Sequence, residues 1–163
     1  MVRPVSEKLR ILNEYIDRAM PPIQLIPLSR ELGVKVYEAA WPDSISGKIQ
    51  RDTQRGGHSG FAIFVKKDHP HRRKRFTIAH ELAHYILHEA IIGDGVFDDA
   101  LYRSGLSNSE ETQANALAAD ILMPWRHLKS YVDRYGDDVA RLSDVFDVSR
   151  SAMSIRIGVP YDG

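Results

Sequence analysis

The sequence contains no cysteine among its 163 residues. A chain without thiols forms no disulfide bonds, no thiolate zinc cluster and no cysteine nucleophile. Any metal site in this protein must therefore use nitrogen ligands from histidine and oxygen ligands from acidic side chains.

The sequence also lacks an excess of charge and a long apolar run. Its 22 basic and 22 acidic residues give a formal net charge of zero, whereas phosphate binding usually leaves a basic excess, so we do not expect direct DNA binding. The amino-terminal stretch MVRPVSEKLRILNEYI mixes charges with apolar residues. It predicts neither a signal peptide nor a membrane span, and we expect a cytoplasmic protein that has no membrane partner.

The order of expected elements places the protein in the α+β class. Two helices are expected first, over residues 6–20 and 23–32, because apolar side chains recur there at helical spacing. Three short strands are expected next, over 34–39, 44–52 and 60–67. They predict a small three-stranded, antiparallel sheet packed against a helical core.

The stretch FTIAHELAHYILH, residues 76–88, carries the strongest chemical signal. His80, Glu81 and His84 form the pattern H-E-x-x-H, which on a helix puts both histidines on one face, about 6 Å apart along the axis. Two such imidazoles can bind one zinc ion, and the glutamate after the first can act as general base on a water molecule. The other interpretation is a core helix whose histidines are hydrogen-bonded within the protein.

His88 lies four residues after His84 and offers a competing pair. It is roughly 12 Å along the helix from His80, whereas two ligands of one zinc lie within about 3.5 Å of each other, so one zinc takes only two of the three histidines. The second pair has Tyr85 where the first has Glu81, and tyrosine is a poor base at neutral pH. The sequence therefore favours His80 and His84, and a third ligand must come from elsewhere.

The segment SEETQANALAADILMP, which ends at Pro124, is expected to form a second helix with an apolar stripe. Glu110 and Glu111 lie in its first turn and flank the stripe, so either carboxylate could face the metal helix. Acids at a helix start also occur simply because they complement the helix dipole. Periodicity alone leaves the choice between them open.

The strings RFTIAHELAHYILH and EETQANALAADILMP together resemble the paired signatures of the ImmA/IrrE family of zinc metallopeptidases. The second signature falls on Glu111 and Asn115, and so implies that Glu111 is the third zinc ligand beside His80 and His84. The resemblance implies a zincin-like metallopeptidase domain over residues 1–136.

The same resemblance implies a function. Members of the family cleave a helix-turn-helix transcriptional repressor, or accompany toxin–antitoxin systems, so we expect a zinc-dependent endopeptidase that cuts a repressor or antitoxin-like protein encoded nearby. In this mechanism Glu81 takes a proton from water and passes it to the leaving amine. Candidates for a second oxyanion donor are Tyr85, Tyr102 and His127. The alternative is a non-catalytic regulator that binds such a partner and keeps the metal fold.

Two segments outside the motifs have alternative interpretations. The basic run KKDHPHRRKR, residues 66–75, is expected to be a solvated loop, although it could grip an acidic substrate or a nucleic acid. The long stretch 91–109 is rich in Gly, Asp and Ser and is expected to be irregular, with a possible part in a substrate cleft.

The tail, residues 137–163, resembles a helix-turn-helix. Asp147 occupies the turn position and Ser149 can cap the second helix. Because Asp144 and Asp147 balance Arg150 and Arg156, we expect the tail to pack on the peptidase domain or dock a protein partner rather than read DNA.

Overall fold

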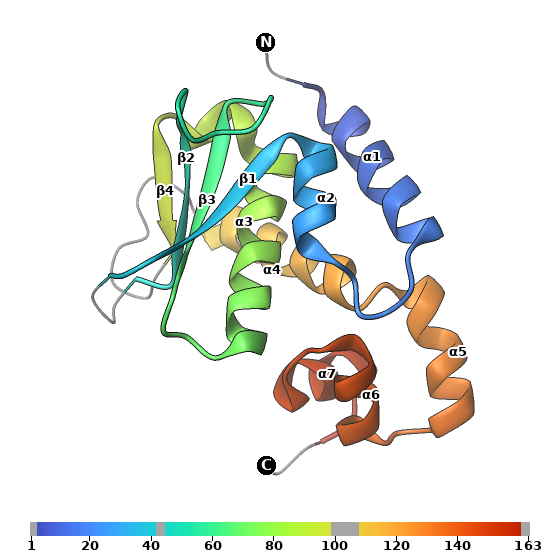
Figure 1. The fold of residues 1–163 in the computed structure, drawn as a ribbon. Coiled ribbons are helices and arrows are strands. Elements are labelled where there is room, and N and C mark those ends of the chain that lie inside the picture. Colours follow the sequence, from blue (N-terminus) through green and yellow to red (C-terminus); the bar gives the residue numbers. More distant parts are fainter. Residues whose placement is uncertain (1–2, 42–44, 99–107, 161–163) are drawn as a thin grey trace.

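The computed structural model describes residues 3–41, 45–98 and 108–160. Two helices come first, α1 (Val5–Arg18) and α2 (Leu25–Leu32), followed by three strands, β1 (Val34–Ala39), β2 (Gly47–Arg51) and β3 (Phe61–Lys66). Next come the long helix α3 (His71–Ile92) and strand β4 (Gly95–Asp98). Four helices complete the fold, α4 (Asn108–Leu122), α5 (Trp125–Tyr135), α6 (Val139–Phe146) and α7 (Arg150–Ile157) (Figure 1).

The predicted α+β class is confirmed, and the sheet differs from the prediction in two details. Its strand order is β1-β3-β2-β4, so it has four strands, and β1 pairs with β3 in parallel. The antiparallel arrangement holds for β2 with β3 and for β2 with β4. The fourth strand, residues 95–98, comes from the stretch that was expected to be irregular; residues 99–107 of that stretch lie outside the described part of the chain.

The position of β3 explains the mixed sheet. Its sequence FAIFVK is buried at every position, whereas β1 alternates between buried, half-buried and exposed residues. A strand that is apolar at all but its last position, as β3 is, is stable in the middle of a sheet, where both faces are covered. β3 therefore inserts between β1 and β2, and since β1 and β3 both run opposite to β2, they pair in parallel.

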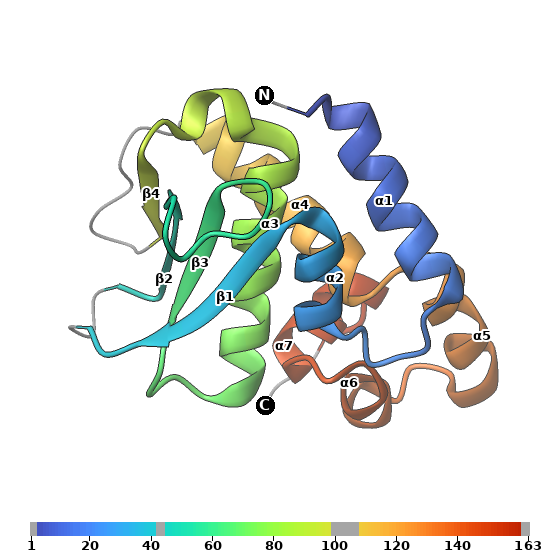
Figure 2. The ribbon, with the colours of Figure 1, turned by 45° about the horizontal axis from the view of Figure 1, so that its top comes forward.

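Helix α3 lies against the sheet on one side and α4 on the other (Figures 1 and 2). It is buried along most of its length, and its helical backbone is interrupted at His88, where φ is −127° and ψ is 21°. The main apolar core joins α2, the sheet, α3 and α4. No helix in the described residues is both long and apolar enough to cross a membrane.

The amino-terminal helix is fastened to α3 by a buried ion pair. Lys8 Nζ lies 2.5 Å from Glu89 Oε1, and both side chains are at most 5% exposed. The same ammonium donates a hydrogen bond to the carbonyl of Tyr85 at 3.0 Å and lies over the Tyr85 ring. Breaking such a buried pair leaves an uncompensated charge in the core, so α1 is an integral part of the fold.

The basic run is not a loop throughout, because residues 71–75 form the first turn of α3. Its side chains hold the tail: Arg72 forms ion pairs with Asp144 and Asp147, and His71 Nε2 lies 2.6 Å from Asp147 Oδ2. The buried Arg75 guanidinium donates to the carbonyl of Asp147 at 3.0 Å. The run therefore binds the chain's own carboxylates.

The tail has the helix-turn-helix geometry that was predicted for it. Asp147 ends α6 in the left-handed conformation with φ of 56°, and the Ser149 hydroxyl caps α7 by accepting a hydrogen bond from the amide of Ala152. Arg156 of α7 donates to the carbonyl of Met123 and to Asp120 Oδ1, so α7 is fixed to the end of α4. The boundary between a peptidase domain ending at residue 136 and a tail starting at 137 stays a prediction.

Candidate metal centre

Helix α3 brings two imidazoles together. His80 and His84 are 2% and 0% exposed, and their Nε2 atoms are 3.0 Å apart. Residues four apart project from one face of a helix, and this face is the one that packs against α4. Phe76, one turn earlier, stacks on the His80 ring with centroids 6.2 Å apart.

The first turn of α4 adds a carboxylate to this pair. Glu111 is 7% exposed. Its Oε2 atom lies 3.2 Å from His80 Nε2, and its Oε1 atom lies 3.1 Å from His84 Nε2. One ligand atom from each of the three residues lies within 4.8 Å of the other two. Glu110 is only half-buried and is not part of this cluster.

The charge states of these groups suit a divalent cation. Burial lowers the pKa of His84, so its ring is neutral near pH 7 and has a lone pair to offer. Burial by itself would raise the pKa of Glu111, but the polar contacts with His80 and His84 outweigh it and hold this pKa well below its usual range. The site therefore combines neutral imidazole with an anionic carboxylate.

The donor set fits zinc in type and spacing. Zinc binds imidazole nitrogen and carboxylate oxygen at about 2.0–2.2 Å, so ligand atoms around one ion lie about 3.3–3.5 Å apart. The three contacts between His80, His84 and Glu111 are 3.0–3.2 Å long. A cation between these atoms would require shifts of only a few tenths of an ångström.

Glu81 lies beside the cluster and is fully buried, at 0% exposure. Strand β2 approaches it closely, because a Cβ atom built on Gly47 would lie 3.9 Å from Glu81 Cγ and only 2.4 Å from Thr77 Cγ2. Glycine is therefore required where β2 passes over α3. The start of β2 therefore lies beside the Glu81 side chain.

The three candidates for a second oxyanion donor differ in their surroundings. Tyr85 is 1% exposed and packs between Lys8 and Phe61. His127 uses its Nε2 atom in a 2.7 Å hydrogen bond with the carbonyl of Ile16. Tyr102 lies outside the described residues. Neither described candidate is directed at the cluster by these contacts.

The structure adds two residues to the surroundings of the cluster. His84 Nδ1 lies 3.1 Å from His88 Nδ1, and His88 Nε2 lies 2.9 Å from Gln113 Oε1. Sequence reasoning had only excluded His88 as a ligand, and it missed Gln113 altogether. No local pattern indicates Gln113, since its contact with His88 exists only when α3 and α4 pack side by side.

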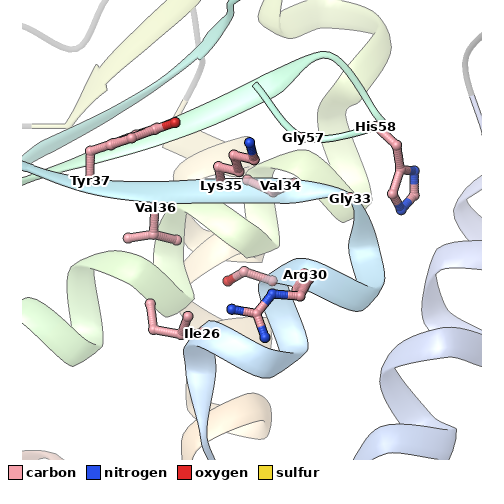
Figure 3. Close-up of a pocket in the computed structure, with 10 residues that line it drawn as sticks. Ile26, Arg30, Gly33, Val34, Lys35, Val36, Tyr37, Gly57 and His58 are labelled. Atoms are coloured by element: carbon pink, nitrogen blue, oxygen red, sulfur yellow. The ribbon is translucent and has the colours of Figure 1, made fainter. Parts of the chain in front are cut away.

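Two cavities bear on where a ligand could bind. One of 360 Å³ lies between α2, β1 and the loop that carries His58, and none of its lining residues belongs to the histidine–glutamate cluster (Figure 3). Another, of 310 Å³, is closer to the cluster because Phe76 is part of its wall; its other walls are Arg72, Arg73, Leu122, Val148, Ser149 and Ala152.

The fold has a relative among solved structures. A protein named Mycobacterium tuberculosis transcriptional regulator has a similar fold, with a TM-score of 0.62 and 18% sequence identity. The similarity covers 94% of this chain and 47% of the other, so this chain spans about half the length of that protein. No curated protein sequence matches the chain.

Sequence comparison identifies the family. The family model for peptidase M78, described as the IrrE N-terminal-like domain, matches residues 30–158. This range contains the sheet, both helices of the cluster and the helical tail. The chain therefore has a metallopeptidase-like fold and belongs to the IrrE N-terminal-like family that its paired motifs predicted.

Proposed function

We propose that this protein is a zinc-dependent endopeptidase in which His80, His84 and Glu111 hold the metal. The observation that carries the proposal is the convergence of these three ligand atoms within 4.8 Å on two packed helices. The family supports the reaction class, since its domain is that of a peptidase.

Each residue has a separate task in this proposal. A zinc ion, when bound, supplies a Lewis acid and lowers the pKa of water toward about 7. His80 and His84 offer neutral nitrogen donors and Glu111 an anionic oxygen. Glu81 accepts a proton from the attacking water and delivers it to the amine that leaves when the peptide bond breaks.

The proposed substrate is a helix-turn-helix repressor or antitoxin-like protein encoded nearby. The solved relative is named a transcriptional regulator, which supports a regulatory setting. The balanced charge of the chain and the internal ion pairs of its basic run support a protein partner rather than direct DNA binding.

One observation favours a second candidate, a regulator that binds its partner without cutting it. Glu81 is 0% exposed, whereas a general base must lie within hydrogen-bonding reach of the water that it deprotonates. In the binding-only protein the cluster would hold metal for stability alone. A substitution at Glu81 separates the two candidates.

The first prediction concerns Glu81→Gln. This change removes the proton-accepting carboxylate, keeps nearly the same volume and leaves His80, His84 and Glu111 in place. We expect the fold and zinc content to be retained and cleavage to fall by about 10²–10⁴-fold. The experiment mixes wild type and variant, each with zinc, with the neighbouring helix-turn-helix protein and follows its fragments by mass spectrometry.

The outcomes of this experiment are distinct. One discrete cut made only by wild type supports the endopeptidase. A stable complex without cutting by either protein favours the binding-only regulator. Equal cutting by both proteins means that Glu81 is not the general base, and the proposed mechanism is then wrong.

A further inference from the structure

Behind His84 lies a row of hydrogen-bonded side chains that leads away from the candidate metal centre. His84 Nδ1 is 3.1 Å from His88 Nδ1, and His88 Nε2 is 2.9 Å from Gln113 Oε1. His84 and His88 are buried, at 0% and 5% exposure. The row thus starts at the cluster on α3 and ends on α4.

The interruption of α3 falls at one member of this row. His88 has non-helical backbone angles, with φ of −127° and ψ of 21°. Its ring, whose centroid is 5.3 Å from that of His84, contacts both the preceding turn and the neighbouring helix. The kink therefore occurs at the residue that connects the two helices through its two ring nitrogens.

The amide oxygen of Gln113 gives the hydrogen bonds of this row a direction. Gln113 Oε1 is an amide oxygen and can only accept, so His88 Nε2 carries the proton that is donated to it. In the neutral ring, His88 Nδ1 then has a lone pair and accepts a hydrogen bond that His84 Nδ1–H donates. This arrangement, which is the one that metal binding requires, leaves the lone pair of His84 on Nε2, the atom that faces His80 and Glu111.

We propose that His88 and Gln113 are positioning residues that hold His84 in the tautomer and ring orientation needed to bind metal. The inference rests on the proposed function, because it assumes that His84 Nε2 is a zinc ligand. Partners behind a ligating histidine commonly set its tautomer, and their loss typically costs about 10–100-fold in metal affinity. Here the partner of a histidine is a second histidine, which is itself oriented by an amide.

Gln113 makes the inference testable without disturbing the core. It is an exposed residue of α4, two positions after Glu111. Gln113→Leu removes the acceptor for His88 Nε2–H, whereas Gln113→Glu replaces it with a stronger acceptor. Ala116→Leu is the matched control, since it adds the same apolar side chain to the exposed surface of the same helix.

The experiment measures the zinc dissociation constant of the full chain by competition with a chromogenic chelator. We expect Gln113→Leu to raise it about 10–100-fold, Gln113→Glu to leave it at or below the wild-type value, and Ala116→Leu to leave it unchanged. A second readout is ¹⁵N NMR of the zinc-loaded imidazoles. It should find His88 protonated at Nε2 in wild type and a mixture of tautomers in Gln113→Leu.

Two results would overturn the inference. One is equal zinc affinity in wild type, Gln113→Leu and Ala116→Leu; the other is a wild-type His88 protonated at Nδ1. Loss of affinity to the same degree in Gln113→Leu and Gln113→Glu also contradicts it, because that pattern indicates a general packing role. A wild-type protein that binds no zinc at all would instead refute the proposed metal site.

Discussion

Glu110 and Glu111 are neighbours in the sequence, but a helix turns them about 100° apart. Glu111 is 7% exposed and contacts both histidines, whereas Glu110 is half-buried and outside the cluster. At the residue scale, the difference between a candidate ligand and a helix-start acid is thus one position along the chain.

The second prediction compares these two acids. Glu111→Gln replaces an anionic oxygen donor by a neutral amide, so we expect the zinc dissociation constant to rise at least about 100-fold. Glu110→Gln should leave zinc affinity unchanged and alter the free energy of unfolding by no more than about 1 kcal/mol through the helix dipole. Chelator competition and urea unfolding measure the two quantities; similar zinc affinities in both variants would contradict the assignment of Glu111.

At the scale of elements, the site depends on how closely β2 approaches α3. The contact is between Gly47 and Thr77, four residues before Glu81, and Thr77 is itself 4% exposed with its hydroxyl bonded to the carbonyl of Arg73. Because a threonine side chain is stiff at its first torsion, its methyl group cannot move aside easily. The spacing between strand and helix is therefore set by the absence of a side chain at Gly47.

The third prediction tests this contact. In Gly47→Ala the new Cβ would lie 2.4 Å from Thr77 Cγ2, so we expect the free energy of unfolding to fall by about 1–3 kcal/mol. Thr77→Ser removes that methyl group and keeps the hydroxyl, so Gly47→Ala with Thr77→Ser should recover part of the loss. Urea unfolding of the two single variants and the double variant gives the coupling energy. Purely additive effects would show that the two residues do not clash.

At the scale of the whole molecule, the basic run fastens the tail to the start of α3. His71, Arg72 and Arg75 all face Asp147, the residue that ends α6. Burial alone would raise the pKa of Asp147, but hydrogen bonds from His71 and Arg72 and the charge of Arg75 outweigh it and lower the pKa. The pKa of Asp147 is thus lower in the folded protein than in the unfolded chain, and the ionised carboxylate stabilises the docked tail.

The fourth prediction concerns Asp147→Asn. Asparagine tolerates the left-handed conformation at this position, so the change removes the charge and keeps the turn. We expect the free energy of unfolding to fall by about 1 kcal/mol at pH 5.5, a modest value because the carboxylate is partly exposed.

The sign of the pH dependence follows from the lowered pKa. The contribution of Asp147 is fully present above its ordinary pKa of 3.8 and disappears as the pH falls through the lower folded value. The difference in the free energy of unfolding between wild type and Asp147→Asn should therefore be constant near pH 5–6 and shrink below about pH 4. Asp144→Asn is the control, since that carboxylate is 66% exposed; a difference that grows toward low pH would refute the assignment.

The sequence by itself determined the elements and the chemistry that they carry. The helical spacing of His80 and His84, the stop of α2 at Gly33 and the turn at Asp147 are local features, because each depends on residues within one or two turns of chain. The paired motifs also identified the family. The run of apolar residues in β3, FAIFV, is typical of a central strand that is buried along its length. The prediction of an antiparallel sheet did not use this signal.

Tertiary structure alone decided which distant groups meet. The contact of Gln113 with His88, the pairing of the basic run with Asp147 and the parallel pairing of β1 with β3 each join residues that are at least 25 positions apart. Such contacts depend on how whole helices and strands pack, and the residues involved have the same local propensities whether or not they touch. For that reason spacing predicted the two histidines, whereas the residues that surround and orient them emerged only from the packing of α3 against α4.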